Sequence, residues 1–164
     1  MNKYSDQATG FTKIYDKDWN VTKERMTFPV LIRKIRQAET PERKGAYYDL
    51  FLPEDVEVPT GEFFLIPLGI AVKLPKGYHA ELVVRSSTPI KWGIISANSL
   101  GVIDNAYCGD NDEWKLLAFR PFGLVKEYPA VIPAGTRIAQ FTIVKDDIEE
   151  NGMGIDIEFQ DVEH

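Results

Sequence analysis

The sequence predicts a single all-β domain, and two observations lead to that prediction. From residue 47 onward the chain consists of short apolar runs separated by Pro or Gly. Such spacing is typical of a β-sandwich or a β-barrel and argues against alternating β and α units. The chain has 164 residues, of which 44% are hydrophobic, and this is enough apolar material for one core.

Composition divides the chain into three parts. Residues 1–27 are polar and charged without periodicity, and we interpret them as an N-terminal extension that packs on the body or on a neighbouring subunit. Residues 28–145 carry the β pattern and form the domain itself. Residues 146–164 form an acidic tail, in which Ile155, Ile157 and Phe159 alternate with acidic residues. This alternation indicates a strand, which we expect to pair with a neighbouring subunit.

Within the domain, each element is expected from a local pattern. A charged segment broken by Pro41 indicates a loop over residues 37–44. Thr88-Pro89 is expected to begin one short helix, because Thr is a favoured cap and Pro suits a first helical turn. The apolar runs that predict strands cover residues 28–35, 63–66, 69–74, 79–84, 94–95, 102–103, 113–119 and 137–144.

Charge and composition exclude several classes of protein. The net charge of −6 argues against a general nucleic-acid or membrane-surface binder. No window approaches the roughly 18 apolar residues of a membrane span, and residues 1–10 lack the apolar centre of a signal peptide. Cys108 is the one cysteine, so no internal disulfide can form and a cytoplasmic location is expected. With two histidines and no paired thiols, a structural zinc site is not expected.

Residues 98–110 are the most informative stretch. Gly101 stands where a side chain would obstruct a close approach, and Val102 and Ile103 form a β-branched pair that favours a buried strand. Asp104 follows at once. An ionisable group directly after a buried apolar pair is held rigidly and partly desolvated, as a general base needs. The alternative is a hairpin in which Asp104 forms an Asx-turn and Tyr107 covers the core.

Four short motifs occur in order along the chain: Ala46-Tyr-Tyr-Asp49-Leu50, Arg85-Ser-Ser87, Asn98-x-x-Gly-Val-Ile-Asp-x-x-Tyr-x-Gly109 and Arg137-Ile-Ala-Gln140. Over roughly residues 28–145 they resemble the motifs of the homotrimeric dUTP pyrophosphatases. Tyr47 stands where that family usually has Gly, which puts the local backbone path in question, because Gly permits dihedrals that Tyr resists. The resemblance implies a jelly-roll-like β-barrel with at most one short helix, in a trimer whose active sites combine more than one subunit.

The same resemblance implies roles for the residues around Asp104. Asp104 would activate the water that attacks the α-phosphorus of dUTP, giving dUMP and pyrophosphate. Tyr107 would pack its ring on the deoxyribose and leave no room for a 2′-hydroxyl; its alternative is a core tyrosine. Asn98 and the neighbouring backbone would form hydrogen bonds with the edge of uracil. The alternative for Asn98 is a turn residue with positive φ. The substrate-binding residues expected in this stretch are Asn98, Gly101, Val102, Ile103 and Tyr107.

The other motifs resemble the parts of the family that contact phosphate. Arg85, Ser86, Ser87 and Gln140 are the phosphate-contacting candidates. Asp49 is expected either to hold Arg85 or to bind waters around the metal, and Arg137 either supports the wall of the site or touches the substrate. Mg²⁺ is the implied cofactor, held mainly by the triphosphate and by waters and not by side chains of the protein. No Gly-x-x-x-x-Gly-Lys-Ser/Thr loop is present, which excludes a P-loop.

The C-terminal tail departs from the family. There a fifth motif, a Gly-rich arm with Arg and Ser/Thr, folds over the phosphates, but here no Arg, Ser or Thr follows Thr142. Residues 146–164 contain eight acids and no Lys or Arg, so this tail would repel a triphosphate. Either the sequence stops before such an arm or this member works without one. Without a lid, turnover is expected to be slow.

Three functions are therefore compared. The first is a trimeric, Mg²⁺-dependent dUTP diphosphatase that uses Asp104 as its base. The alternative is a dUTP-binding regulatory module with little turnover, which acts through a protein partner; the missing arm and the unusual residues 1–27 favour it. The third is a nucleotide deaminase of similar fold, for which we find no characteristic pairing around Asp104.

Overall fold

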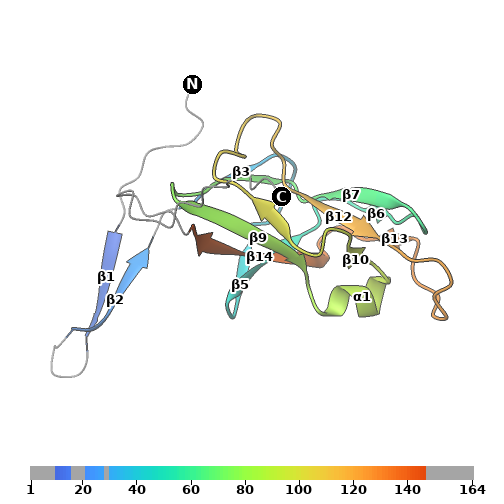
Figure 1. Ribbon diagram of the computed structural model, residues 1–164, viewed down its shortest axis with the longest axis horizontal. Helices are drawn as coiled ribbons and strands as arrows, with labels where there is room; N and C mark the ends of the chain where they lie inside the picture. Colours follow the sequence, from blue (N-terminus) through green and yellow to red (C-terminus); the bar gives the residue numbers. More distant parts are fainter. Residues whose placement is uncertain (1–9, 16–20, 28–29, 147–164) are drawn as a thin grey trace, which may run out of the picture.

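The computed structural model describes residues 10–15, 21–27 and 30–146 (Figure 1). Within these residues it contains strands β1 to β14 and one short helix, α1. This confirms the predicted all-β class. The strands fall into five sheets, and none of the described sheets closes into a barrel. No described helix is long and apolar enough to span a bilayer.

The largest sheet is antiparallel and has the order β11-β9-β14-β5-β4. Its two long strands, β9 (Tyr78–Val84) and β14 (Arg137–Lys145), pair from Val84↔Ala139 to Tyr78↔Lys145. β5 (Tyr47–Phe51) and β4 (Glu42–Lys44) extend the sheet beyond β14, and β11 (Gly101–Ile103) forms the opposite edge. This sheet therefore carries all four sequence motifs in or directly beside its strands.

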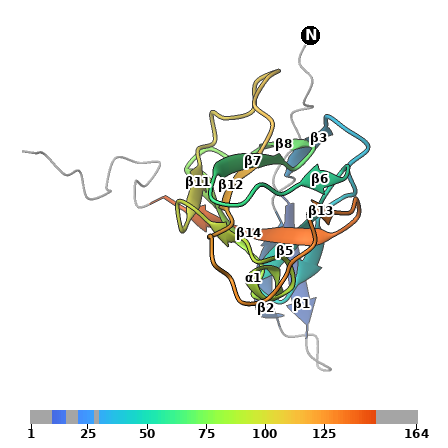
Figure 2. The same cartoon turned by 90° about the vertical axis from the view of Figure 1, so that its right-hand side faces the viewer.

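A second sheet packs over the first, with the order β10-β12-β7. Its strands are β7 (Phe63–Pro67), β10 (Ile95–Ser96) and β12 (Lys115–Phe119). Figure 2 shows β7 and β12 above β14 and β5, and the core fills the space between the two layers. Trp114 lies at the centre of this core with no exposed surface, and its ring meets Phe141 edge-on at 5.1 Å between centroids.

One face of the second sheet is apolar and open to solvent. Phe63 is 72% exposed and Leu65 is 56% exposed on β7. In the ladder, Phe63 lies opposite Phe119, which in turn lies opposite Ile95 on β10, so these side chains share one face. The rings of Phe63 and Phe119 are 5.0 Å apart. We call this surface the β7 face; a single copy of the chain leaves it uncovered.

The smaller elements complete the fold. β3 (Leu31–Lys34) pairs with β8 (Ile70–Lys73), and β6 (Val56–Glu57) pairs with β13 (Val131–Ile132). β1 (Gly10–Tyr15) and β2 (Val21–Thr27) form an antiparallel pair of their own, in the extension where no periodicity predicted regular structure. The interpretation of residues 37–44 as a loop is wrong at its end, where β4 pairs with β5. The expected strand at residues 155–159 lies outside the described residues.

The predicted short helix is present, although it begins before Thr88. α1 spans Ser87–Trp92, and Ser86 occupies the cap position without a side-chain capping hydrogen bond. Thr88 is buried inside the first turn, where its hydroxyl donates to the carbonyl of Ile138 at 2.7 Å. This bond attaches α1 to β14. It explains why Thr occurs here without acting as the cap.

Candidate functional site

Arg85 and Asp104 lie at opposite ends of β9, and each belongs to a group of predicted site residues. Figure 1 shows β9 crossing the molecule and leading into α1. Arg85 follows the C-terminal end of this strand, whereas Asp104 follows Ile103, which pairs with Ala80 near its start. In register, Asp104 therefore lies beside His79. The six residue-to-residue steps from His79 to Arg85 span about 20 Å at about 3.3 Å per residue.

We call the first set the Arg85 group, and it contains Asp49, Arg85, Ser86, Ser87 and Gln140. We call the second set the β11 group, and it contains Asn98, Gly101, Val102, Ile103, Asp104 and Tyr107. The structure brings the members of each group together. In one copy of the chain Arg85 and Asp104 stay apart, whereas Gly101, opposite Leu82, lies across β9 from Gln140, opposite Val83.

A buried carboxylate is at the centre of the Arg85 group. The side chain of Asp49 is 1% exposed, and its Oδ1 lies 3.0 Å from Nε of Arg85. Its Oδ2 lies 3.8 Å from Nη1 of Arg137, which also donates from Nη2 to Glu42. Neither oxygen of Asp49 has an aligned hydrogen bond, so both contacts are ionic. Of the two expectations for Asp49, the contact with Arg85 is the one that this geometry matches.

The remaining members of the Arg85 group lie around this ion pair. Gln140 on β14 pairs with Asp49 on one side and with Val83 on the other. Ser86 is exposed and Ser87 begins α1. The guanidinium of Arg85 contacts Asp49 on its buried side. The side chain is 29% exposed, so it is also open to solvent. Two guanidinium groups share one buried carboxylate here, and such a surface is suited to an anion.

The β11 group lies on the edge strand of the large sheet. Ile103 is buried, but Val102 is 61% exposed, so the expectation of a buried apolar pair is wrong for Val102. Successive side chains of a strand point to opposite faces, and only one face of β11 meets the core. Asp104 is exposed as well. The expected partial desolvation of its carboxylate is therefore absent within one copy of the chain.

The turn before β11 is strained at one residue. Ser99 has φ of 60°, and it is the non-glycine residue with positive φ in the described part of the chain. The positive φ expected of Asn98 as a turn residue is therefore found at the next residue, Ser99. The Oδ1 of Asn98 accepts a hydrogen bond from the hydroxyl of Ser96 at 2.9 Å.

Gly101 is not required by the packing of its own chain. A Cβ at this position would lie 3.4 Å from the nearest atoms of Leu82, which is an ordinary contact. The close approach expected at Gly101 is therefore not one within its own chain. It concerns the open edge of β11, where another molecule can lie against the backbone.

Tyr107 is not a core tyrosine, because the residue is 40% exposed. Its backbone N–H donates to the carbonyl of Asp104 at 3.0 Å, which fixes these two residues in one turn. Its hydroxyl donates to the carbonyl of Glu113 at 3.4 Å. The ring is thus held at both ends and open to solvent on its surface.

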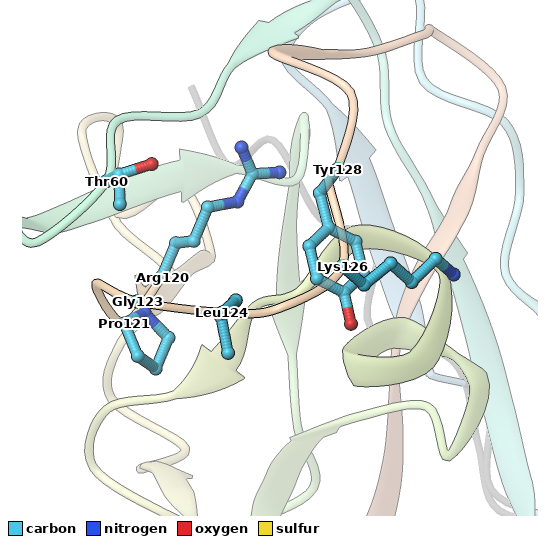
Figure 3. Close-up of a pocket in the computed structure, with 7 residues that line it drawn as sticks. All are labelled: Thr60, Arg120, Pro121, Gly123, Leu124, Lys126 and Tyr128. Carbon is cyan, nitrogen blue, oxygen red and sulfur yellow. The ribbon is translucent and has the colours of Figure 1, made fainter.

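Sequence reasoning missed a buried arginine beside α1. Arg120 is 5% exposed, and its guanidinium donates to the carbonyls of Trp92 at 2.7 Å and Pro129 at 2.8 Å. Burial lowers the pKa of Arg120. Figure 3 shows it beside Tyr128 in a cavity of about 160 Å³. No local pattern could have revealed it, because its carbonyl partners Val58, Trp92 and Pro129 lie on three other segments of the chain.

Comparison with known proteins shows which family this chain matches. A family model described as dUTPase matches residues 34–153. The SPbeta prophage-derived deoxyuridine 5′-triphosphate nucleotidohydrolase YosS of Bacillus subtilis is 46% identical over 102 residues, which cover 62% of this chain and 68% of that protein. A deoxyuridine 5′-triphosphate nucleotidohydrolase of Hydrogenobaculum is 37% identical over 120 residues, covering 70% of this chain and 78% of that protein.

Solved structures agree with the family model. A dUTPase from Streptococcus mutans superposes with a TM-score of 0.61 at 27% identity, covering 70% of this chain and 94% of that one. A Staphylococcus bacteriophage 80alpha dUTPase superposes with a TM-score of 0.63 at 24% identity, covering 84% and 98%. At that identity, the second likeness shows the fold alone.

Proposed function

Because the chain belongs to the dUTPase family, we propose that it hydrolyses dUTP to dUMP and pyrophosphate at sites shared between copies of the chain. The separation of Arg85 and Asp104 along β9 is the observation that carries this proposal. A base that acts at the α-phosphorus must lie within a few ångströms of the groups that bind the phosphates. Across about 20 Å of strand, Asp104 and Arg85 of one copy cannot meet on one triphosphate.

We propose a homotrimer as the assembly that brings the two groups together. The β11 group of one copy would face the Arg85 group of another. The β7 face supports self-association, because exposed apolar surfaces of this kind favour protein contacts. Trimers of closed symmetry place the same surfaces in contact around one axis, so that every site is built alike.

The β11 edge would bind the uracil base. An edge strand offers unpaired backbone N–H and C=O groups, and these have fixed polarity. Uracil and cytosine differ in donor and acceptor at position 4, so such a strand can accept one and reject the other. Gly101 supports this role because it leaves the backbone open to a planar ring.

Tyr107 would select the sugar. Its exposed ring gives a flat apolar surface for deoxyribose, and the ribose of UTP would bring a 2′-hydroxyl against it without a partner. Leaving such a group without a hydrogen bond costs about 1–3 kcal/mol. One ring can therefore favour dUTP over UTP by a useful factor.

Asp104 would act as the general base. Its carboxylate accepts a proton from a water molecule, the water oxygen forms a bond to the α-phosphorus, and the bond to the bridging oxygen of pyrophosphate breaks. General base catalysis contributes about 10²–10⁴-fold to a rate. The cleft that another copy would close over Asp104 supplies the partial desolvation that a single copy lacks.

The Arg85 group would bind the phosphates. Arg85, held from below by Asp49, presents a cation, while Ser86, Ser87 and Gln140 present neutral donors. No described cluster of three acidic, His or Cys side chains could hold a metal, and Asp49 is already paired with arginine. Mg²⁺ held by the triphosphate and by waters would neutralise phosphate charge beside Arg85.

Replacing Asp104 by Asn tests the proposal. The wild-type chain is expected to release pyrophosphate from dUTP in preference to dCTP, dTTP and UTP. Asp104→Asn should lose about 10²-fold or more of kcat while binding a non-hydrolysable dUTP analogue in calorimetry. Equal rates for the two proteins would refute the role of Asp104. The regulatory module with little turnover is not favoured, since the relatives are named as nucleotidohydrolases.

A further inference from the structure

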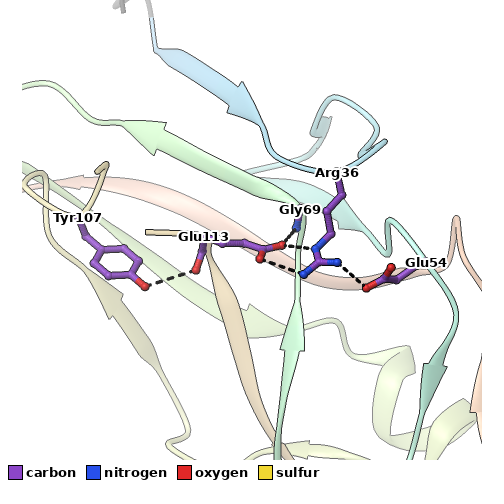
Figure 4. A network of polar contacts seen from close by, with 5 residues as sticks. All are labelled: Arg36, Glu54, Gly69, Tyr107 and Glu113. Atoms are coloured by element: carbon purple, nitrogen blue, oxygen red, sulfur yellow. Dashed lines mark hydrogen bonds and ion pairs between the residues drawn. The ribbon is translucent and has the colours of Figure 1, made fainter. Parts of the chain in front are cut away.

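A line of polar contacts leads from Tyr107 into the body of the protein (Figure 4). The hydroxyl of Tyr107 donates to the backbone carbonyl of Glu113. The Oε1 of Glu113 accepts from Nε of Arg36 at 2.9 Å and from the backbone N–H of Gly69 at 3.0 Å. Arg36 also pairs with Glu54 at 2.9 Å, on the outer side.

Glu113 is unusually placed for a carboxylate. Its side chain is 10% exposed, whereas that of Glu54 is 54% exposed. A buried carboxylate is costly unless it is paired and hydrogen-bonded, and Glu113 has both kinds of partner. The hydrogen bond that Arg36 donates to Glu113 raises the pKa of Arg36. The side chain of Glu113 is therefore fixed in one orientation.

The backbone of Glu113 is fixed by the residue after it. Trp114 is fully buried, and its N–H donates to the carbonyl of Ile70 at 2.8 Å. The carbonyl that receives the Tyr107 hydroxyl thus belongs to a residue held through both its side chain and its neighbour. Glu113 is therefore a rigid residue that directly follows a segment without a strand.

The loop between Ile103 and Trp114 depends on a few such supports. Asp104 and Tyr107 are both on it, and it has no strand or helix of its own. Arg33 donates to the carbonyl of Gly109, and the N–H of Gly109 donates to Asp112 at 2.7 Å. Of these contacts, the one that reaches the Tyr107 side chain is that of Glu113.

We propose that Glu113, held by Arg36, is a positioning residue for Tyr107 and thereby sets the preference for 2′-deoxyribonucleotides over ribonucleotides. This inference rests on the proposed function. Rejection of a 2′-hydroxyl requires that the ring stay where the hydroxyl would go. When the ring can move away, the hydroxyl gains room and water, and the penalty disappears.

A purely structural role would give a different result. Loss of a buried ion pair lowers stability and reduces the amount of active protein equally for dUTP and UTP. Only a change in the position of Tyr107 alters the ratio of the activity with dUTP to the activity with UTP. The ratio of kcat/KM values, and the ratio of dissociation constants for non-hydrolysable dUTP and UTP analogues, therefore separate the two roles.

The test compares Glu113→Ala, Glu113→Gln and Arg36→Met with Glu54→Gln, which removes only the outer partner of Arg36. In Glu113→Ala and Arg36→Met the dUTP/UTP ratio should fall about tenfold, and in Glu113→Gln it should fall less, because the amide oxygen still accepts from Gly69. Glu54→Gln should leave the ratio unchanged. An unchanged ratio in Glu113→Ala, or in Glu113→Gln and Arg36→Met if Glu113→Ala does not fold, overturns the proposal.

Tyr107→Phe supplies an independent check. It removes the hydroxyl and keeps the ring, so it should reduce the ratio as Glu113→Ala does, and the double variant should lose no more than either single one. Additive losses would overturn the proposal. Failure of the proposed function is recognised separately, because the wild-type chain would then show neither binding nor Asp104-dependent hydrolysis of dUTP.

Discussion

Asn98 shows how one hydrogen bond decides what an amide can recognise. Its Oδ1 accepts from the hydroxyl of Ser96, which directs the Nδ2 donors away from that contact. A donor at this edge of β11 matches the carbonyl at position 4 of uracil and opposes the amino group of cytosine. If Asn98 reads the base as proposed, Ser96 acts on base selection without being part of any of the four motifs.

Ser96→Ala should weaken the discrimination between dUTP and dCTP. Without the hydroxyl, the amide of Asn98 can rotate and present its oxygen, which accepts from cytosine. We expect the ratio of kcat/KM for dUTP over dCTP to fall about tenfold, since hydrogen-bonded recognition depends on correct polarity. Steady-state pyrophosphate release measures this ratio. Ser96→Thr restores the hydroxyl and should restore the ratio; if it does not, the hydroxyl is not the cause.

Arg120 is a residue whose importance concerns stability. Its guanidinium donates to carbonyls at the end of α1 and in the segment before β13, and each would be left unpaired by an apolar replacement. Arg120→Met should lower the free energy of unfolding by about 2–6 kcal/mol, at about 1–3 kcal/mol for each of the two stranded carbonyls. Arg120→Lys should recover only part of this, because an ammonium lacks the planar fork. Urea denaturation measures both; a loss below 0.5 kcal/mol (about the size of an ordinary surface change) would contradict the assignment.

At the scale of elements, β9 and β14 are joined by an ion pair where they meet the end of the described domain. Nδ1 of His79 on β9 lies 2.6 Å from Asp146, which follows β14, and the N–H of Asp146 donates to Gly77 at 2.8 Å. The hydrogen bond to Asp146 raises the pKa of His79. Protonated His79 is thus favoured by folding.

This contact makes stability depend on pH. A raised pKa in the folded state gives stabilisation that is fully present below the unfolded pKa of about 6.5 and is lost as pH rises through the folded value. Asp146→Asn should therefore lower the melting temperature relative to wild type at pH 6, and the difference should shrink as the pH rises to 9. Thermal unfolding followed by circular dichroism at both pH values tests this. A difference that grows with pH would contradict it.

Much of the β pattern is readable because it is local. β9 and β14 come from long apolar runs, and the sequence predicted both within about two residues at each end. β2 and β4 were not predicted, since charged residues interrupt any alternation in them. Val102 was misjudged because a β-branched residue indicates a strand and does not reveal which face is covered.

The candidate site divides in the same way. Arg85 and Asp104 are candidate site residues because each stands in a short motif whose members are close together in the sequence. The contacts that hold them in place could not be predicted in this way, because they join distant segments. Arg36 and Glu113 are separated by 77 positions, and no local spacing predicts that such residues meet.

At the scale of the whole molecule, the geometry of one copy has a consequence for the assembly. The β7 face exposes Phe63 and Leu65 on a sheet whose other face is in the core. Burying such a surface against another copy gains roughly 25 cal/mol for each Å² of apolar area. Phe63→Glu places a charge on this face and should reduce the assembly to single copies, which size-exclusion chromatography with light scattering detects.

Mixing two inactive variants tests whether sites are shared. In the proposed trimer, Asp104→Asn lacks the base and Arg85→Ala lacks the phosphate cation, so neither variant alone is expected to have a complete site. When equal amounts are unfolded together and refolded, each site has one chance in two of taking its base from an Arg85→Ala chain, and one in two of taking its arginine from an Asp104→Asn chain. About one quarter of wild-type activity should therefore return. Adding Phe63→Glu to both variants should abolish this recovery, which would mark the β7 face as the contact. Because a site built from one copy contains both residues of that copy, it would give no recovery at any mixing ratio.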